Sequence, residues 1–143
     1  MGGRRDYRGR VKSRDPQSKR RALIKAAAED IVERGYANST LASTAARIGL
    51  TKGAFAYHFP TKADLVAALS EIAGEQVAEA DAVATLLYPE GGLKEYLVYD
   101  RLTGERFVTD PVMQAMNVML FDPTTPSEIV ERLDAWRRAE SGA

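Results

Sequence analysis

The sequence contains no cysteine and only one histidine. Without cysteine the chain has no disulfide framework, no thiolate nucleophile and no cysteine-based zinc site. The single histidine, His58, has no second histidine with which to share a metal ion or a proton relay. Because no set of nucleophile, base and metal ligands is assembled elsewhere, we expect that the chain is not an enzyme and needs no cofactor or metal.

Long apolar runs are also lacking. The uncharged stretch from Pro111 to Phe121 is too short for a membrane span, which needs roughly 18 apolar residues. The N-terminus is basic, with Arg4 and Arg5, but the apolar segment of a secretory signal does not follow it. We therefore expect a cytoplasmic chain without a membrane partner.

What the sequence has instead is a strong separation of charge. The formal net charge is zero, from 20 basic and 20 acidic residues. Residues 1–62 contain 14 Lys or Arg and 5 Asp or Glu, a net charge of +9, whereas residues 63–143 contain 6 and 15, a net charge of −9. Such asymmetry suggests that the basic half faces a polyanion, either nucleic acid or an anionic membrane surface. Residues 4–14 lack the apolar face of a membrane-binding helix, which favours nucleic acid.

The spacing of apolar residues predicts an all-α fold. From Ser18 onward they recur at the spacing of one-sided helices, and no segment shows sustained period-two alternation. Capping residues, prolines and glycines divide this pattern into seven helices. The first is capped by Ser18 and ends at Gly35, a long fourth helix follows the cap at residues 61–64, and residues 88–92 form a linker. The domains are then a basic flexible arm (residues 1–17), a helix-turn-helix domain (18–64) and a helical regulatory domain (65–143).

The second and third helices, Thr40–Ile48 and Lys52–Phe59, are typical of a helix-turn-helix motif because a short glycine-containing turn joins them. The third helix is slim at its start, where its free N–H groups suit a phosphate. Lys52 can reach a guanine edge or a phosphate, and Tyr57 and His58 can donate to phosphates. Gly53 costs up to about 1 kcal/mol relative to alanine inside a helix. Close approach of the backbone to DNA explains that cost, and an ordinary loop residue is the alternative.

Residues 18–65 resemble the DNA-binding domain of TetR-type transcriptional regulators. The resemblance is carried by Gly35-Tyr36, Ser39-Thr40-Leu41 and the unbroken string from Gly49 to Leu65. Position by position, it implies that the DNA-facing residues are Thr40, Thr51, Lys52, Gly53, Tyr57, His58 and Lys62. It further implies that Lys62, at the start of the fourth helix, contacts a phosphate.

Shorter matches resemble the γ-butyrolactone receptor branch of this family. They are residues 51–54 with His58-Phe59, residues 110–112 with Ala115, and Trp136-Arg137. The sequence departs from the family pattern at Ala56, where a tyrosine is usual, and at Thr44, where a larger aliphatic side chain is usual. The regulatory domain of the family normally continues beyond the position of Ala143. We therefore expect a truncated regulatory domain, which bears on the homodimer that the family implies.

Two further sets of residues each allow two interpretations. The arginines of residues 1–17 form either an arm that lies along DNA or a solvated tail. Sulfur and aromatic side chains of the second half form either a pocket for a small apolar effector or ordinary core packing. The first set is Arg4, Arg5, Arg8 and Arg10, and the second is Tyr96, Met113, Met116, Met119 and Trp136.

The sequence and its resemblance thus predict a DNA-binding transcriptional regulator. Its partner is a double-stranded DNA operator, and it is a repressor released by a small-molecule effector such as a γ-butyrolactone-like signal. The alternative is a truncated homologue that does not repress, and that sequesters ligand or forms a heterodimer with a full-length regulator.

Overall fold

The computed structural model describes residues 15–140, with side chains as far as residue 135. Arg4, Arg5, Arg8 and Arg10 of the predicted arm lie outside the described residues, as does the side chain of Trp136. Within the described range the chain forms seven α-helices and no strand, which confirms the predicted all-α fold. The helices are α2 (Pro16–Arg34), α3 (Leu41–Arg47), α4 (Lys52–His58), α5 (Lys62–Leu87), α6 (Leu93–Thr109), α7 (Pro111–Phe121) and α8 (Ser127–Glu140).

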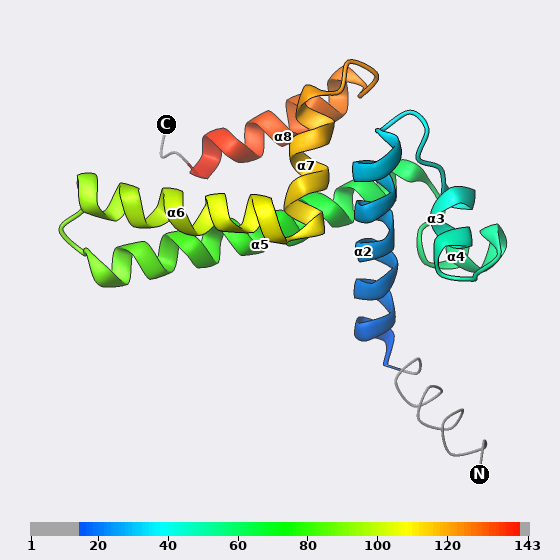
Figure 1. The fold of residues 1–143 in the computed structure, drawn as a ribbon, viewed down its shortest axis with the longest axis horizontal. Coiled ribbons are helices and arrows are strands. Elements are labelled where there is room, and N and C mark those ends of the chain that lie inside the picture. Colours follow the sequence, from blue (N-terminus) through cyan, green and yellow to red (C-terminus); the bar gives the residue numbers. More distant parts are fainter. Residues whose placement is uncertain (1–14, 141–143) are drawn as a thin grey trace, which may run out of the picture.

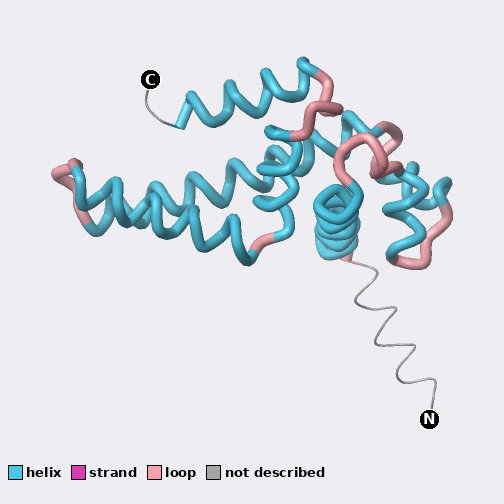
Figure 2. Tube along the Cα trace, turned by 45° about the horizontal axis from the view of Figure 1, so that its top comes forward, coloured by secondary structure: helices cyan, strands magenta, loops and turns pink. Residues whose placement is uncertain are grey.

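The helices are arranged around α5, which takes part in both halves of the molecule. Its C-terminal part pairs with α6 in a long antiparallel hairpin, and α3 and α4 lie at the opposite end (Figure 1). Between these ends α7 packs against α2 and α5, and α8 packs on α5 and α7. The tilted view of Figure 2 shows the same long hairpin at one end of the molecule and the two short helices at the other. No helix in the described part of the chain is both long and apolar enough to cross a membrane.

Three threonines cap the two helices of the helix-turn-helix motif and the helix that follows it. The hydroxyls of Thr40, Thr51 and Thr61 accept hydrogen bonds from backbone N–H groups in the first turns of α3, α4 and α5. These bonds satisfy donors that a helix start leaves unpaired. The predicted cap of the first helix was wrong, because Asp15 rather than Ser18 accepts from Gln17 N, and α2 therefore begins inside the predicted arm.

The turn between α3 and α4 requires a glycine. Gly49 has a φ of +69°, in the left-handed region, and a β-carbon there would meet no atom within 4 Å. The requirement therefore lies in the backbone conformation and not in the available space. Leu50 N then donates to Ala45 O over 2.9 Å, which closes the turn. This is the tight stop that the sequence predicts.

One apolar core joins the helix-turn-helix motif to the rest of the chain. Leu23, Ile24 and Ile31 of α2 are buried in it, as are Phe55 of α4 and Met113 of α7. Burial of such side chains contributes about 1.5–3 kcal/mol each relative to exposure. The two halves therefore share a core within the described residues, although the charge of the sequence separates them.

Thr44 introduces a polar group into this core. Its side chain is 0% exposed, and its hydroxyl has no hydrogen-bond partner among the described residues. Such an unpaired buried group costs about 1–3 kcal/mol. The departure from the family pattern at this position is thus a source of instability.

We predict that Thr44→Val raises the free energy of unfolding by about 1 kcal/mol, because valine keeps the shape and removes the unpaired hydroxyl. Urea unfolding followed by circular dichroism measures the change. The matched control is Thr103→Val, because the buried hydroxyl of Thr103 donates to Tyr99 O over 2.9 Å. An equal gain in both variants, or no gain from Thr44→Val, would contradict this account.

Candidate nucleic-acid interface

Helix α4 has a buried side and an exposed side that divide its functional roles. Phe55 and Phe59 are buried and contact each other, with ring centroids 5.9 Å apart. Lys52, Gly53 and Tyr57 are exposed, and Tyr57 keeps 85% of its surface in solvent. The aromatic pair therefore anchors the helix and leaves its N-terminal end accessible.

A shallow groove brings together three of the residues predicted to face DNA. It lies between the starts of α3 and α4, has a volume of about 510 Å³, and is lined by Thr40, Lys52 and Lys62. Small side chains, including Ala37 and Ala42, complete its walls. Lys52 and the hydroxyl of Thr40 at this groove can donate hydrogen bonds to a phosphate or to a base edge.

The other predicted DNA-facing residues lie along α4. Thr51 caps the helix, Gly53 is exposed, and a β-carbon at Gly53 would meet nothing within 4 Å. The rings of Tyr57 and His58 pack edge to face, with centroids 5.3 Å apart. His58 is partly exposed, so both rings remain available at the end of the helix.

The ammonium of Lys62, which is predicted to contact a phosphate, is hydrogen-bonded within the protein. Its ammonium donates to Ser39 O over 2.6 Å and to Tyr36 O, and it lies 3.8 Å from the centroid of the Tyr36 ring. Burial lowers the pKa of Lys62, although the charges of Asp30 and Asp122 oppose that shift. In this structure the ammonium is therefore committed to backbone carbonyls and an aromatic face, whereas the resemblance implies a phosphate contact.

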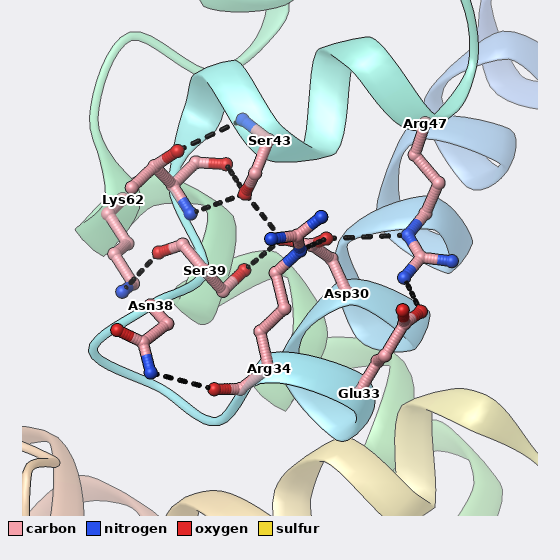
Figure 3. A network of polar contacts seen from close by, with 9 residues as sticks. Asp30, Glu33, Arg34, Asn38, Ser39, Ser43, Arg47 and Lys62 are labelled. Atoms are coloured by element: carbon pink, nitrogen blue, oxygen red, sulfur yellow. Dashed lines mark hydrogen bonds and ion pairs between the residues drawn. The ribbon is translucent and has the colours of Figure 1, made fainter.

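The sequence did not reveal the carboxylate that organises the motif. Asp30, on α2, is 1% exposed and accepts hydrogen bonds from Ser39 Oγ over 2.7 Å and from Ser43 Oγ over 2.6 Å (Figure 3). Arg34 Nε lies 3.0 Å and Arg47 Nε 3.4 Å from the same carboxylate. Asp30 thus connects α2 with the loop before α3 and with both ends of α3. The available signal was an acidic residue among the apolar positions of the first helix.

The environment of Asp30 keeps it ionised. Burial by itself raises the pKa of this carboxyl group. Hydrogen bonds from Ser43, Ser39 and Arg47 and the charge of Arg34 together lower it by more than burial raises it, so the pKa lies below its ordinary value. Ser43 also completes the cap of α3, because its backbone N–H donates to Thr40 Oγ1 over 2.9 Å. The charge of Asp30 therefore positions α3, the helix that precedes α4.

The side chains predicted as an effector pocket differ in their burial. Met113, Met116 and Met119 are buried in the core, whereas Tyr96 on α6 is 60% exposed. The core-packing interpretation therefore describes the methionines, because α7 uses them to pack against its neighbours. The sulfur and aromatic composition of the set fits both interpretations, so an effector site near these residues stays a prediction.

A second cleft lies elsewhere, between α2, α5 and the start of α7. It has a volume of about 510 Å³, with Ile24 and Ile72 on its apolar part. Basic side chains of α2 face acidic side chains of α5 across it, including Lys25 and Glu79. No group of three potential metal ligands occurs among the described residues.

Comparison with known proteins places the motif in a family. Residues 23–69 match the model of the bacterial regulatory proteins of the tetR family. This stretch, which contains α3 and α4, is thus similar to the bacterial regulatory proteins of the tetR family. The match begins in α2 and ends in α5, so it includes α3, α4 and the Asp30 contacts.

Three relatives from Pseudomonas putida carry names of transcriptional regulators. The HTH-type transcriptional regulator CymR is 30% identical over 106 residues, which are 73% of this chain and 51% of that protein. ArpR, named as a probable HTH-type transcriptional regulator, is 36% identical over 87 residues, 59% of this chain and 41% of that protein. The HTH-type transcriptional regulator TtgR is 44% identical over 55 residues, 38% and 26% of the two chains. The matches thus span about half the length of these relatives or less, and no solved structure matches significantly.

We predict that Asp30→Asn lowers the free energy of unfolding by about 2–4 kcal/mol at pH 7, because two arginines and two hydroxyls lose a buried anion. The folded-state pKa of Asp30 lies below its ordinary value of 3.8, so the stabilisation is present above that pH and is lost as the pH falls through the folded-state pKa. The difference between wild type and variant should therefore narrow in acid.

Chemical unfolding at pH 7 and near pH 3 measures that difference. The control is Glu29→Gln on the same helix, because the ion pair of Glu29 with Lys25 is exposed and 3.9 Å long. Such a pair contributes at most about 1 kcal/mol. Equal effects of the two substitutions would contradict the assigned role of Asp30.

Proposed function

We propose that the chain is a DNA-binding transcriptional regulator in which α4 enters the major groove. The observation that carries the proposal is the exposed, slim start of α4 in a tetR-family domain. Lys52 and Gly53 stand there, while Phe55 holds the helix against the core. A helix presented in this way is how helix-turn-helix proteins read base edges.

Charge supports DNA as the partner. Residues 1–62, which contain the motif, carry a net charge of +9. Arg20 and Arg21 on α2 are exposed, and the guanidinium of Arg20 lies 5.4 Å from the centroid of the Phe59 ring at the end of α4. Basic side chains near a recognition helix can neutralise phosphates and raise the association rate with DNA.

We further propose that the regulator is a repressor released by a small molecule acting on residues 65–143. The sequence resemblance suggests a γ-butyrolactone-like effector. Helix α5 supports a coupling role because it contacts α2 as well as α6, α7 and α8. Since the methionines of α7 are packed, an effector in their region would have to separate α7 from its neighbours.

The resemblance also implies a homodimer, and the end of the α5–α6 hairpin offers a surface for it. Leu86, Leu87, Leu93 and Leu97 are exposed there. Contiguous patches of exposed apolar side chains mark contact surfaces in soluble proteins. Light scattering on the purified chain tests the dimer. A monomer that binds no DNA alone, but pairs with a longer regulator, would favour the alternative of a heterodimerising homologue.

Binding to DNA should depend steeply on salt and on Lys52. If about six phosphates are neutralised, affinity should fall roughly a thousandfold between 50 and 200 mM salt. Lys52→Ala should reduce the preference for the selected duplex over a scrambled one by about 1–3 kcal/mol. Fluorescence anisotropy with a labelled duplex, selected by the wild-type chain from a random library, measures both effects.

The matched control is Lys94→Ala. Lys94 lies in the first turn of α6, at the far end of the molecule from α4 (Figure 1). The control removes the same charge and should leave the preference unchanged. Equal losses in both variants, or failure of the wild type to select any duplex at low salt, would overturn the proposed function.

Gly53→Ala should separate folding from DNA binding. A β-carbon at Gly53 meets nothing within 4 Å, so alanine fits and should stabilise the protein by up to about 1 kcal/mol. The added methyl group would stand between the helix backbone and the DNA and should weaken affinity. Thermal unfolding and anisotropy measure the two effects, and unchanged affinity would show that the backbone does not approach DNA at this point.

A further inference from the structure

The backbone of Tyr36 is held on both sides by residues far away in the sequence. Its N–H donates to Asp122 Oδ2 over 2.8 Å, across 86 positions, and its carbonyl accepts from Lys62 Nζ. Tyr36 stands in the short loop between α2 and α3, and the cap of α3 follows at Thr40. The backbone of this one residue of the helix-turn-helix domain is thus hydrogen-bonded to the end of α7 and to the start of α5.

Asp122 is itself fixed in place. It ends α7, and its Oδ1 accepts from Thr124 N over 2.8 Å and from Thr124 Oγ1 over 2.6 Å. These bonds leave Oδ2 directed at Tyr36. Hydrogen bonds from Thr124 and Tyr36 lower the pKa of Asp122, and the nearby charge of Lys62 lowers it further, so the carboxylate is ionised at neutral pH.

Gly35 is shaped for this contact. Its φ of +80° lies in the left-handed region, and a β-carbon built there would stand 3.2 Å from Asp122 Oδ2. A larger residue would therefore be strained and would also push the carboxylate away from Tyr36. Both the conformation and the space at Gly35 fit the approach of Asp122.

The contact continues into the recognition motif. Lys62 also donates to Ser39 O over 2.6 Å, and Ser39 Oγ donates to Asp30. Asp30 in turn accepts from Ser43 in α3. A continuous series of hydrogen bonds therefore leads from the end of α7, through the loop, to the helix that packs against α4.

We infer that Asp122, which lies outside the tetR-family match, is a positioning residue that sets the loop before α3 and thereby the placement of the DNA-reading helices. This inference rests on the proposed DNA binding. Asp122 would act by holding the Tyr36 N–H, and a displacement of the end of α7 would release it. A movement of the α7–α8 turn would therefore be transmitted through Asp122 to the helix-turn-helix domain.

The decisive variants are Asp122→Ala, which removes the acceptor, and Asp122→Asn, which keeps an oxygen acceptor and loses the charge. The control is Glu128→Gln, because Glu128 is exposed at the start of α8 and has a matching charge. Loss of a negative charge alone should raise affinity for DNA. A fall in affinity on removing Asp122 would thus be opposite to the simple electrostatic effect.

We expect amide hydrogen exchange at Tyr36 to be at least about tenfold faster in Asp122→Ala, with loss of protection in α3 and none in the α5–α6 hairpin. Affinity for the selected duplex should fall about tenfold in Asp122→Ala. Asp122→Asn should restore only part of both properties and should still bind more weakly than Glu128→Gln. If Asp122→Ala does not fold, Asp122→Asn against Glu128→Gln remains the test, and a lower affinity for Asp122→Asn than for the control is the supporting result.

Tyr36 exchange as slow in Asp122→Ala as in wild type, or DNA affinity equal to that of Glu128→Gln in every folded Asp122 variant, would overturn the inference. Its failure is distinguishable from failure of the proposed function. A wild-type chain that selects no duplex defeats DNA binding, whereas the exchange measurement tests the hold on Tyr36 without any DNA.

Discussion

The charge of a carboxylate that is removed from water has to be compensated by the protein around it. Asp30 imposes that requirement on the helix-turn-helix domain. Its compensation comes from three separate segments: Arg34 one turn further along α2, Ser39 in the loop, and Ser43 and Arg47 in α3. If any one of these groups moves away, the buried charge of Asp30 loses part of its compensation. The angle between α2 and α3 is therefore fixed by electrostatics as well as by packing.

Helix α4 obtains its position differently, because it has only seven residues and no buried charge. Its orientation depends on the buried rings of Phe55 and Phe59, on the cap at Thr51 and on the preceding turn at Gly49. With the anchoring confined to one side, the exposed first turn of the helix can consist of a lysine, a glycine and an alanine. A reading surface with so little bulk would not hold a helix by itself, so the core contacts are what make it possible.

Local features of this chain could be predicted from the sequence, and features that join distant segments could not. The cap at residues 61–64 and the glycine turn between α3 and α4 depend on residues at most a few positions apart, and the sequence indicated both. The ammonium of Lys62 meets carbonyls 23 and 26 positions away, and Asp122 meets Tyr36 across 86. Periodicity carries no information on such pairs, so the partners of Lys62 and the role of Asp122 required the fold.

The opposite charges of the two halves and their shared core together determine how information can pass between them. Apolar contacts between α2 and α7 hold the halves together but tolerate small sliding, since they are not directional. The bonds at Tyr36 are directional and short, and they are lost over a few tenths of an ångström to about one ångström. A shift of α7 that the core absorbs would still break them. The hydrogen-bonded loop, and not the core, is consequently where a change in the acidic half becomes a change in the basic half.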